Sequence, residues 1–137
     1  MTKDELRTHR KAVREVRQLH EQLRTLETAM LDPRAPNLAA TPRGSGPSNP
    51  VERAILRVEA LRGRYADKLA ALLAQQELIE QAIERLDPCE RMVIREYYIA
   101  GRSWERVCET MHYTERHTHR IHGRALQKLQ DVSQCQF

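Results

Sequence analysis

Long apolar runs are absent from the sequence. No stretch approaches the about 18 apolar residues that a membrane-spanning helix needs, so an integral membrane protein is excluded. The first fifteen residues, MTKDELRTHRKAVRE, are charged throughout, and we expect no secretory signal. The three cysteines, Cys89, Cys108 and Cys135, are an odd number at wide spacings and form no disulfide framework. Free thiols of this kind favour a cytoplasmic protein.

Aromatic residues, glycine and proline are also scarce. The 137 residues include six aromatic residues, five glycines and six prolines, and five of the prolines fall between positions 33 and 50. So few aromatic residues argue against a large β core. Outside the proline-rich window almost nothing interrupts a helix. We therefore predict an all-α fold.

A heptad pattern occupies the segment before the prolines. Apolar residues recur at intervals of three and four from Val16 to Met30, which is typical of a helix with an apolar seam. Thr2 and Glu5 have the spacing of a capping box, in which each side chain bonds the backbone N–H of the other. These signals predict a helix over residues 3–31.

A second long helix is predicted after the prolines. Asn49 can cap it, Pro50 suits its first position, and apolar residues continue at helical spacing as far as Leu86. Neither helix can bury its apolar stripe alone. We therefore predict a coiled-coil-like antiparallel hairpin over residues 1–86, with a flexible linker at 32–50. Because two helices still leave an incomplete core, we also predict a homodimer formed through the heptad faces.

Three shorter helices are predicted after residue 86. The run DPCE at 87–90 is a capping box with proline at the first helical position. Ser103 and Thr114 can cap the next two helices, and His112-Tyr113 forms a tight turn between them. Two helices joined by a short turn, behind a supporting helix, form a helix-turn-helix. We predict a trihelical module of this kind over residues 87–137.

The outer face of the last predicted helix, residues 114–129, is basic. Positions 115–128 carry four basic residues, one acidic residue and three histidines, in a chain of net charge +4. Arginines on the face opposite Ile121 can contact phosphates or the edges of guanine bases. The amino end of the helix capped by Ser103 can also approach a phosphate. The predicted DNA-binding residues are Arg102, Ser103, Thr114, Arg116, His117, His119, Arg120, Arg124 and Gln127.

The histidines near the turn raise the alternative of a metal site. Zinc takes four ligands in a tetrahedron, usually at paired short spacings. Cys108 instead falls on the buried stripe of its helix, and His117 and His119 point to different sides of theirs. We predict no metal and no cofactor. Because the sequence contains no phosphate-binding loop, nucleophile motif or hydrolytic metal motif, we also predict that the protein is not an enzyme.

The run LDPCERMVIREYYIAGRSWERVCETMHYTERHTHRIHGRALQKL, residues 86–129, resembles region four of sigma-70-type sigma factors. The resemblance depends on Glu90-Arg91, Val93-Ile94, Tyr97-Tyr98, Gly101, Ser103-Trp104-Glu105 and Arg124-Ala125-Leu126-Gln127-Lys128-Leu129. With the heptad helices and the PRAPNL…NPVERA linker in front, the whole chain resembles small phage or prophage transcriptional regulators that end in such a module. The resemblance implies double-stranded DNA as a partner and RNA polymerase as a second partner. The sequence departs from the motif at His112, where a left-handed glycine is usual.

Three functions remain open from the sequence. The preferred one is a DNA-binding transcriptional regulator that reads duplex DNA with the helix at 114–129. The alternatives are an RNA polymerase-docking protein without sequence-specific DNA binding, and a DNA-packaging protein similar to a phage small terminase subunit. A DNA reader needs Arg116 and Arg120 exposed on a basic face, whereas a polymerase-docking protein does not.

Overall fold

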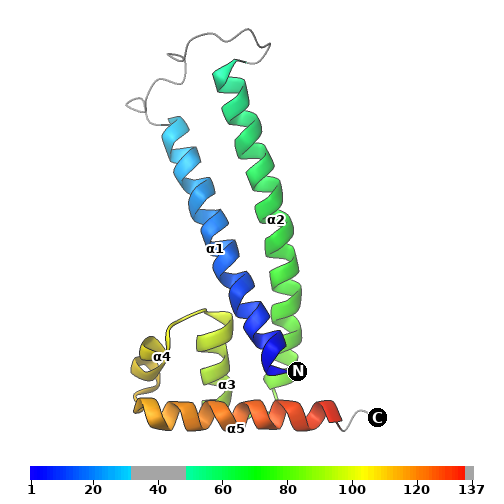
Figure 1. Ribbon diagram of the computed structural model, residues 1–137, viewed down its shortest axis with the longest axis vertical. Helices are drawn as coiled ribbons and strands as arrows, with labels where there is room; N and C mark the ends of the chain where they lie inside the picture. Colours follow the sequence, from blue (N-terminus) through cyan, green and yellow to red (C-terminus); the bar gives the residue numbers. More distant parts are fainter. Residues whose placement is uncertain (32–48, 135–137) are drawn as a thin grey trace. The chain divides into compact units, whose positions relative to one another are not determined.

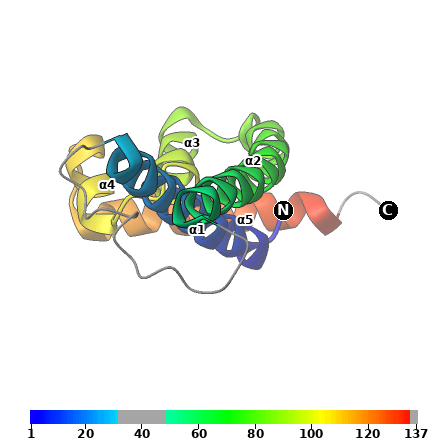
Figure 2. The same cartoon turned by 90° about the horizontal axis from the view of Figure 1, so that it is seen from above.

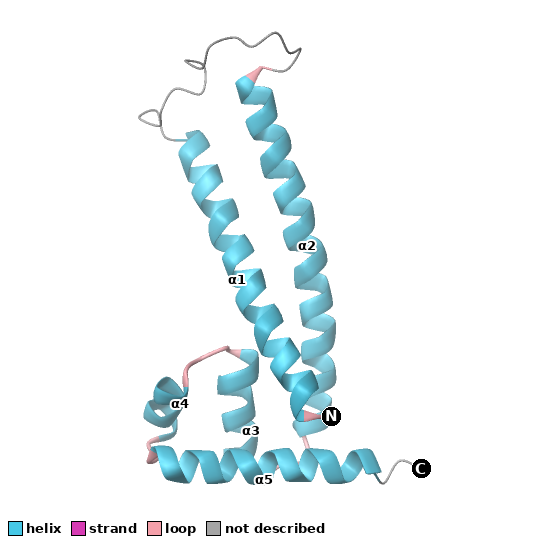
Figure 3. Ribbon diagram, viewed as in Figure 1, coloured by secondary structure: helices cyan, strands magenta, loops and turns pink. Residues whose placement is uncertain are grey.

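The computed structural model describes residues 1–31 and 49–134, and it is helical over almost all of them (Figures 1 and 3). In these residues the elements in chain order are α1 (Lys3–Leu31), α2 (Pro50–Ile83), α3 (Pro88–Ile94), the π-helical turn η2 (Arg95–Ile99), α4 (Trp104–Met111) and α5 (Glu115–Gln134). No strand occurs in this part of the chain, which confirms the predicted all-α class. Most of the predicted linker, residues 32–48, lies outside the described residues.

The helices begin where the sequence signals place them. The Thr2 N–H donates to Glu5 Oε2 at 2.6 Å, and the Glu5 N–H donates to Thr2 Oγ1 at 3.2 Å. Asn49 Oδ1 accepts from the N–H of Val51 at 3.1 Å. Such side-chain acceptors satisfy the backbone donors that the first turn of a helix leaves unpaired. α2 ends at Ile83, three residues before the predicted end at Leu86.

The described chain forms two compact units. One unit comprises Met1–Glu15 and Ala71–Phe137, and the other comprises Val16–Ala70. The start of α1 and the end of α2 thus belong to the unit that contains α3, α4 and α5. The predicted domains, residues 1–86 and 87–137, stay a prediction.

Two apolar clusters hold the first unit together. The larger one joins residues of α1, α2, α3, η2 and α5 with Leu86: Leu6, Ile79, Ile83, Leu86, Ile94, Tyr98, Ala125 and Leu129. The smaller one fills the space between α3, α4 and α5 with Val93, Val107, Met111 and Ile121. α3 and α4 both pack against α5 (Figures 1 and 2).

In the second unit, residues of α1 contact residues of α2. Arg62 Nη2 lies 2.7 Å from Glu27 Oε1, and the rings of His20 and Tyr65 have centroids 5.5 Å apart. The later α1 residue meets the earlier α2 residue, so the two segments run in opposite directions within this unit. The heptad residues Val16, Leu19 and Leu23 are buried here. The hairpin over the whole of residues 1–86 stays a prediction.

The Leu6 side chain connects the first turns of the chain to the core of the C-terminal helices. It is fully buried in the larger cluster. Leu6→Ala should lower the free energy of unfolding by about 2–5 kcal/mol, through lost burial and the cavity left behind. Urea unfolding followed by fluorescence measures this, because Trp104, the single tryptophan of the chain, lies in the same unit.

The matched control is Leu73→Ala, because Leu73 also lies in the first unit but is 54% exposed. This change should cost less than about 1 kcal/mol. Equal unfolding midpoints for the two variants would contradict the role of Leu6.

Candidate DNA-binding surface

Two of the predicted site residues, Ser103 and Thr114, cap the helices of the helix-turn-helix. The N–H of Arg106 donates to Ser103 Oγ at 3.3 Å at the start of α4. The N–H of His117 donates to Thr114 Oγ1 at 3.2 Å at the start of α5. Both hydroxyls therefore hold the helix ends in place, and both residues are exposed at those ends.

The turn between α4 and α5 depends on a left-handed residue. His112 has φ 58° and ψ 35°, so it adopts the conformation that glycine usually supplies. The N–H of His112 donates to the Glu109 carbonyl and the N–H of Tyr113 to the Cys108 carbonyl, each at 3.3 Å. This is the Schellman pattern that ends a helix. The departure from glycine noted in the sequence is thus accommodated without loss of the turn.

α5 has one buried face and one exposed face. The residues predicted to turn inward, Thr118, Ile121, Ala125 and Leu129, are buried at 0% to 3% exposed, and His122 is buried beside them. The exposed face carries four of the predicted site residues: Arg116, Arg120, Arg124 and Gln127. The structure therefore brings these four side chains together along one surface of α5.

The two predicted site histidines contact aromatic rings. The ring of His119 lies 4.4 Å from that of Trp104, and its Nε2 is 3.6 Å from Glu115 Oε1. The ring of His117 meets the ring of Tyr113 edge-on at 4.6 Å. Both side chains are thus held against neighbours at the margin of the arginine surface.

Arg102 differs from the other predicted site residues because its charge is already paired. Its Nη1 lies 2.7 Å from Glu96 Oε2 and 3.5 Å from Thr110 Oγ1. The side chain is 43% exposed, so it borders solvent while bound to the carboxylate. A phosphate would have to compete with Glu96 for this guanidinium.

A buried hydrogen bond that the sequence did not reveal joins α5 to η2. Tyr98 Oη lies 2.8 Å from His122 Nε2. Burial lowers the pKa of His122 to about 4 and raises the pKa of Tyr98 to about 12. At neutral pH both groups are therefore uncharged, and the imidazole tautomer decides which of them donates. The sequence placed His122 only at the flank of the buried stripe, and helical spacing gave no sign of its partner.

His9 on α1 is a second buried imidazole. It is 2% exposed, and neither ring nitrogen has a hydrogen-bond partner among the described residues. Burial lowers its pKa, because the charged form would lose its hydration. Both buried histidines lie in the first unit.

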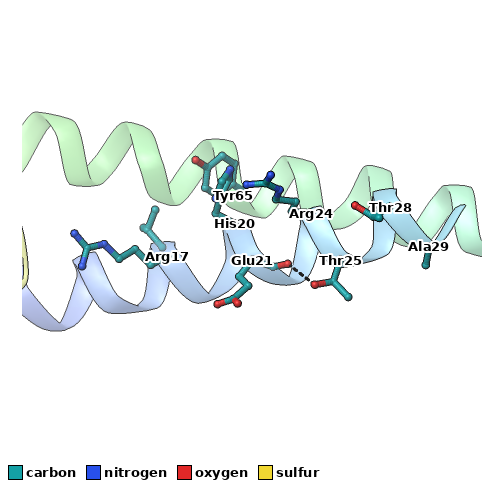
Figure 4. A pocket seen from close by; sticks show the side chains of 9 residues that line it. Arg17, His20, Glu21, Arg24, Thr25, Thr28, Ala29 and Tyr65 are labelled. Carbon is teal, nitrogen blue, oxygen red and sulfur yellow. Dashed lines mark hydrogen bonds between the residues drawn. The ribbon is translucent and has the colours of Figure 1, made fainter. Parts of the chain in front are cut away.

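Groups of three or more residues that could hold a metal ion do not occur within residues 1–31 and 49–134. In the same ranges no helix is both long and apolar enough to cross a membrane. A groove in the second unit is lined by charged and polar side chains of α1 such as Arg17, His20 and Arg24, with Tyr65 from α2 (Figure 4). This groove is wide open to solvent, whereas a small-molecule site is usually enclosed, and we assign it no ligand.

The comparisons with known proteins agree with the geometry of this unit. Residues 82–131 match the family model for sigma-70, region 4, a DNA-binding helix-turn-helix. The match runs from the last residues of α2 into α5 and includes every predicted site residue. No curated protein and no solved structure is significantly similar to the chain. The resemblance inferred for residues 86–129 is therefore confirmed at the level of this module.

The buried histidines predict that the protein loses stability in mild acid. The unfolded chain binds a proton at His122 near pH 6.5, whereas the folded chain does so only near pH 4. The contribution is therefore complete above about pH 6.5 and is lost as the pH falls toward 4. We expect His122 to account for about 2–3 kcal/mol between pH 7 and 4.5, and His9 to act in the same direction.

Urea unfolding at several pH values, monitored through Trp104, measures this loss. His122→Gln is the comparison, because the amide stays neutral and can still donate to or accept from the Tyr98 hydroxyl. Its free energy of unfolding should fall less steeply between pH 7 and 4.5. If the free energy of unfolding falls equally steeply with pH in the wild type and in His122→Gln, the role of His122 in acid sensitivity is refuted.

Proposed function

We propose that the protein is a cytoplasmic DNA-binding transcriptional regulator of phage or mobile-element origin, and that α5 reads duplex DNA. The observation that carries this proposal is the exposed arginine surface of α5, in a segment that matches sigma-70 region 4. The proposed role needs no catalytic residue, metal or cofactor. Arginine suits it because a guanidinium can bind one phosphate or bridge the O6 and N7 atoms of guanine.

The charge of this surface lies in the first turns of α5. Arg116, Arg120 and Arg124 are exposed and four residues apart, so they form one stripe. Lys128 continues the spacing, but its Nζ lies 3.3 Å from Asp87 Oδ2 and 3.0 Å from Glu90 Oε1. The stripe therefore ends at Arg124. Recognition helices contact base edges mainly with their N-terminal residues, which supports a role for Arg116 and Arg120 in reading sequence.

Replacing Arg116 and Arg120 by alanine should weaken DNA binding without unfolding the protein, because both side chains are exposed. If they contact bases, each change should cost about 1–3 kcal/mol on a preferred duplex and relax sequence preference. If they contact only phosphates, binding should weaken equally on all sequences, and its dependence on salt should flatten. Gel-shift titrations against duplexes selected from a random pool measure both effects.

The control is the double variant Arg57→Ala and Arg64→Ala. Both residues are exposed on α2, so the variant has the same net charge as the test variant. It should keep most of the sequence preference. If the test variant binds as tightly as the wild type, or if the wild type binds no duplex at low salt, the DNA-reading role is rejected.

The alternatives make different predictions in the same experiment. If the protein instead docks on RNA polymerase, the Arg116/Arg120 variant should still bind polymerase. Selection from a random pool should then yield no preferred duplex. A DNA-packaging protein similar to a phage small terminase subunit should bind DNA without controlling transcription. Co-sedimentation with polymerase and a reporter assay separate these functions from a regulator.

We also propose a homodimer formed through the heptad faces. Among the described residues of the second unit, five large apolar side chains stay exposed: Met30 at 39%, Leu31 at 84%, Val51 and Ile55 at 42% each, and Leu56 at 62%. Met30, Leu31 and Ile55 line an apolar groove together with Val58. A second copy would cover this surface and place two recognition helices on one duplex, which suits a two-fold operator.

Equilibrium sedimentation at micromolar concentration tests the dimer. The wild type should sediment at twice the chain mass of 16.0 kDa. The double variant Val51→Glu and Ile55→Glu should be monomeric, because charge on this exposed apolar surface opposes association. A wild-type monomer would contradict the proposal.

A further inference from the structure

Arg10 is a buried cation at the start of α1 that contacts the connection leading into the helix-turn-helix. It is only 9% exposed. Its Nη1 donates to the carbonyl of Tyr97 and, at 2.9 Å, to the carbonyl of Arg102. Its guanidinium carbon lies 3.9 Å from the centre of the Tyr97 ring. One side chain thus joins α1 to η2 and to the segment between η2 and α4.

The backbone at this connection departs from ordinary helical pairing. The N–H of Ala100 donates to the carbonyl of Arg95 at 2.8 Å, which is an i to i+5 bond. The N–H of Arg102 reaches the carbonyl of Glu96 at 3.1 Å, and Gly101 takes φ 70°. Widened turns of this kind need outside partners for their displaced carbonyl groups. Arg10 donates to one such carbonyl, that of Tyr97, and also to the carbonyl of Arg102 in the connection before α4.

Successive ring contacts connect Arg10 to the candidate DNA-binding surface. The rings of Tyr97 and Trp104 stack with centroids 4.0 Å apart and planes 18° apart. The ring of Trp104 in turn lies 4.4 Å from that of His119 on α5. His119 borders the arginine surface, with 43% of its side chain exposed. The contacts are therefore continuous from α1 to α5.

We propose that Arg10 is a positioning residue for DNA recognition. It fixes the η2–α4 connection and the Tyr97 ring, and through Trp104 it fixes the orientation of His119 beside the arginine stripe. The part of this proposal that concerns DNA rests on the proposed function. Burial of a cation is costly unless its donors are used, so the energy of these contacts depends on the exact placement of both carbonyl groups and the ring.

Arginine is required at this position for a geometric reason. A planar guanidinium can stack on a ring while its edge donates in fixed directions. A lysine ammonium is a point charge, and it cannot stack flat on Tyr97 while keeping both carbonyl bonds. Arg10→Lys should therefore restore the charge without restoring the placement of Trp104.

The test compares Arg10→Met, Arg10→Lys and the control Arg14→Met, whose arginine is exposed one turn later on α1. Because Trp104 is the single tryptophan, near-ultraviolet circular dichroism and emission report on its ring environment. The nuclear magnetic resonance signals of the His119 ring report on its orientation, at the last of these ring contacts. Affinities are measured on a selected duplex and on a random duplex at low salt.

Arg10→Met should change the Trp104 spectra, shift the His119 ring signals and weaken binding to the selected duplex about tenfold. Arg10→Lys should recover less than half of the lost binding free energy, so its affinity for the selected duplex should stay more than about threefold below that of the wild type. On the random duplex Arg10→Met and Arg14→Met should behave alike, because each removes one positive charge. Arg14→Met should leave the Trp104 and His119 signals unchanged.

Three results would overturn the proposal: unchanged Trp104 and His119 signals in Arg10→Met, a loss on the selected duplex no larger than that of Arg14→Met, or full rescue by lysine. Should Arg10→Met fail to fold, Tyr97→Leu breaks the stack and leaves both carbonyl groups in place. Tyr97→Leu must then change the Trp104 and His119 signals and weaken binding to the selected duplex. If the wild type binds no duplex, the proposed function fails, and the spectra alone decide whether Arg10 positions Trp104 and His119.

Discussion

Burial of the Leu6 side chain against the C-terminal helices is the contact on which the first unit depends. α3, η2 and α4 are short, and α5 has only one apolar face, so by themselves α3, α4 and α5 enclose only the smaller cluster around Val93, Val107, Met111 and Ile121. The missing surface comes from the first turns of α1 and the last turns of α2, through residues such as Leu6, Ile79 and Ile83. The helix-turn-helix is therefore one side of a larger unit.

Much of this fold could be predicted from local signals. Caps at Thr2, Ser103 and Thr114 mark helix starts, because a hydroxyl that accepts from the first turn is a short-range feature. The inward face of α5 followed from helical spacing alone, and so did the exposure of Arg116 and Arg120. Each of these features involves residues within two or three turns of one another.

The features that the sequence did not reveal all depend on distant partners. Leu6, His9 and Arg10 precede the heptad run, and nothing in their spacing indicates burial against residues from the other end of the chain. The π-helical turn and the bond between Tyr98 and His122 likewise arise from tertiary packing. The same contacts place the start of α1 and the end of α2 in one compact unit with α3, α4 and α5.

The shared core also fixes the order of events during synthesis of the chain. Leu6 and Leu129 belong to one cluster although about 120 residues separate them. A ribosome that adds about 5–20 residues per second needs roughly 6–25 s to cover that interval. α1 emerges first, and the Leu6 side chain cannot complete its contacts until α5 has left the exit tunnel. The first unit is therefore completed only after translation of its last helix, and folding in the direction of synthesis cannot finish it earlier.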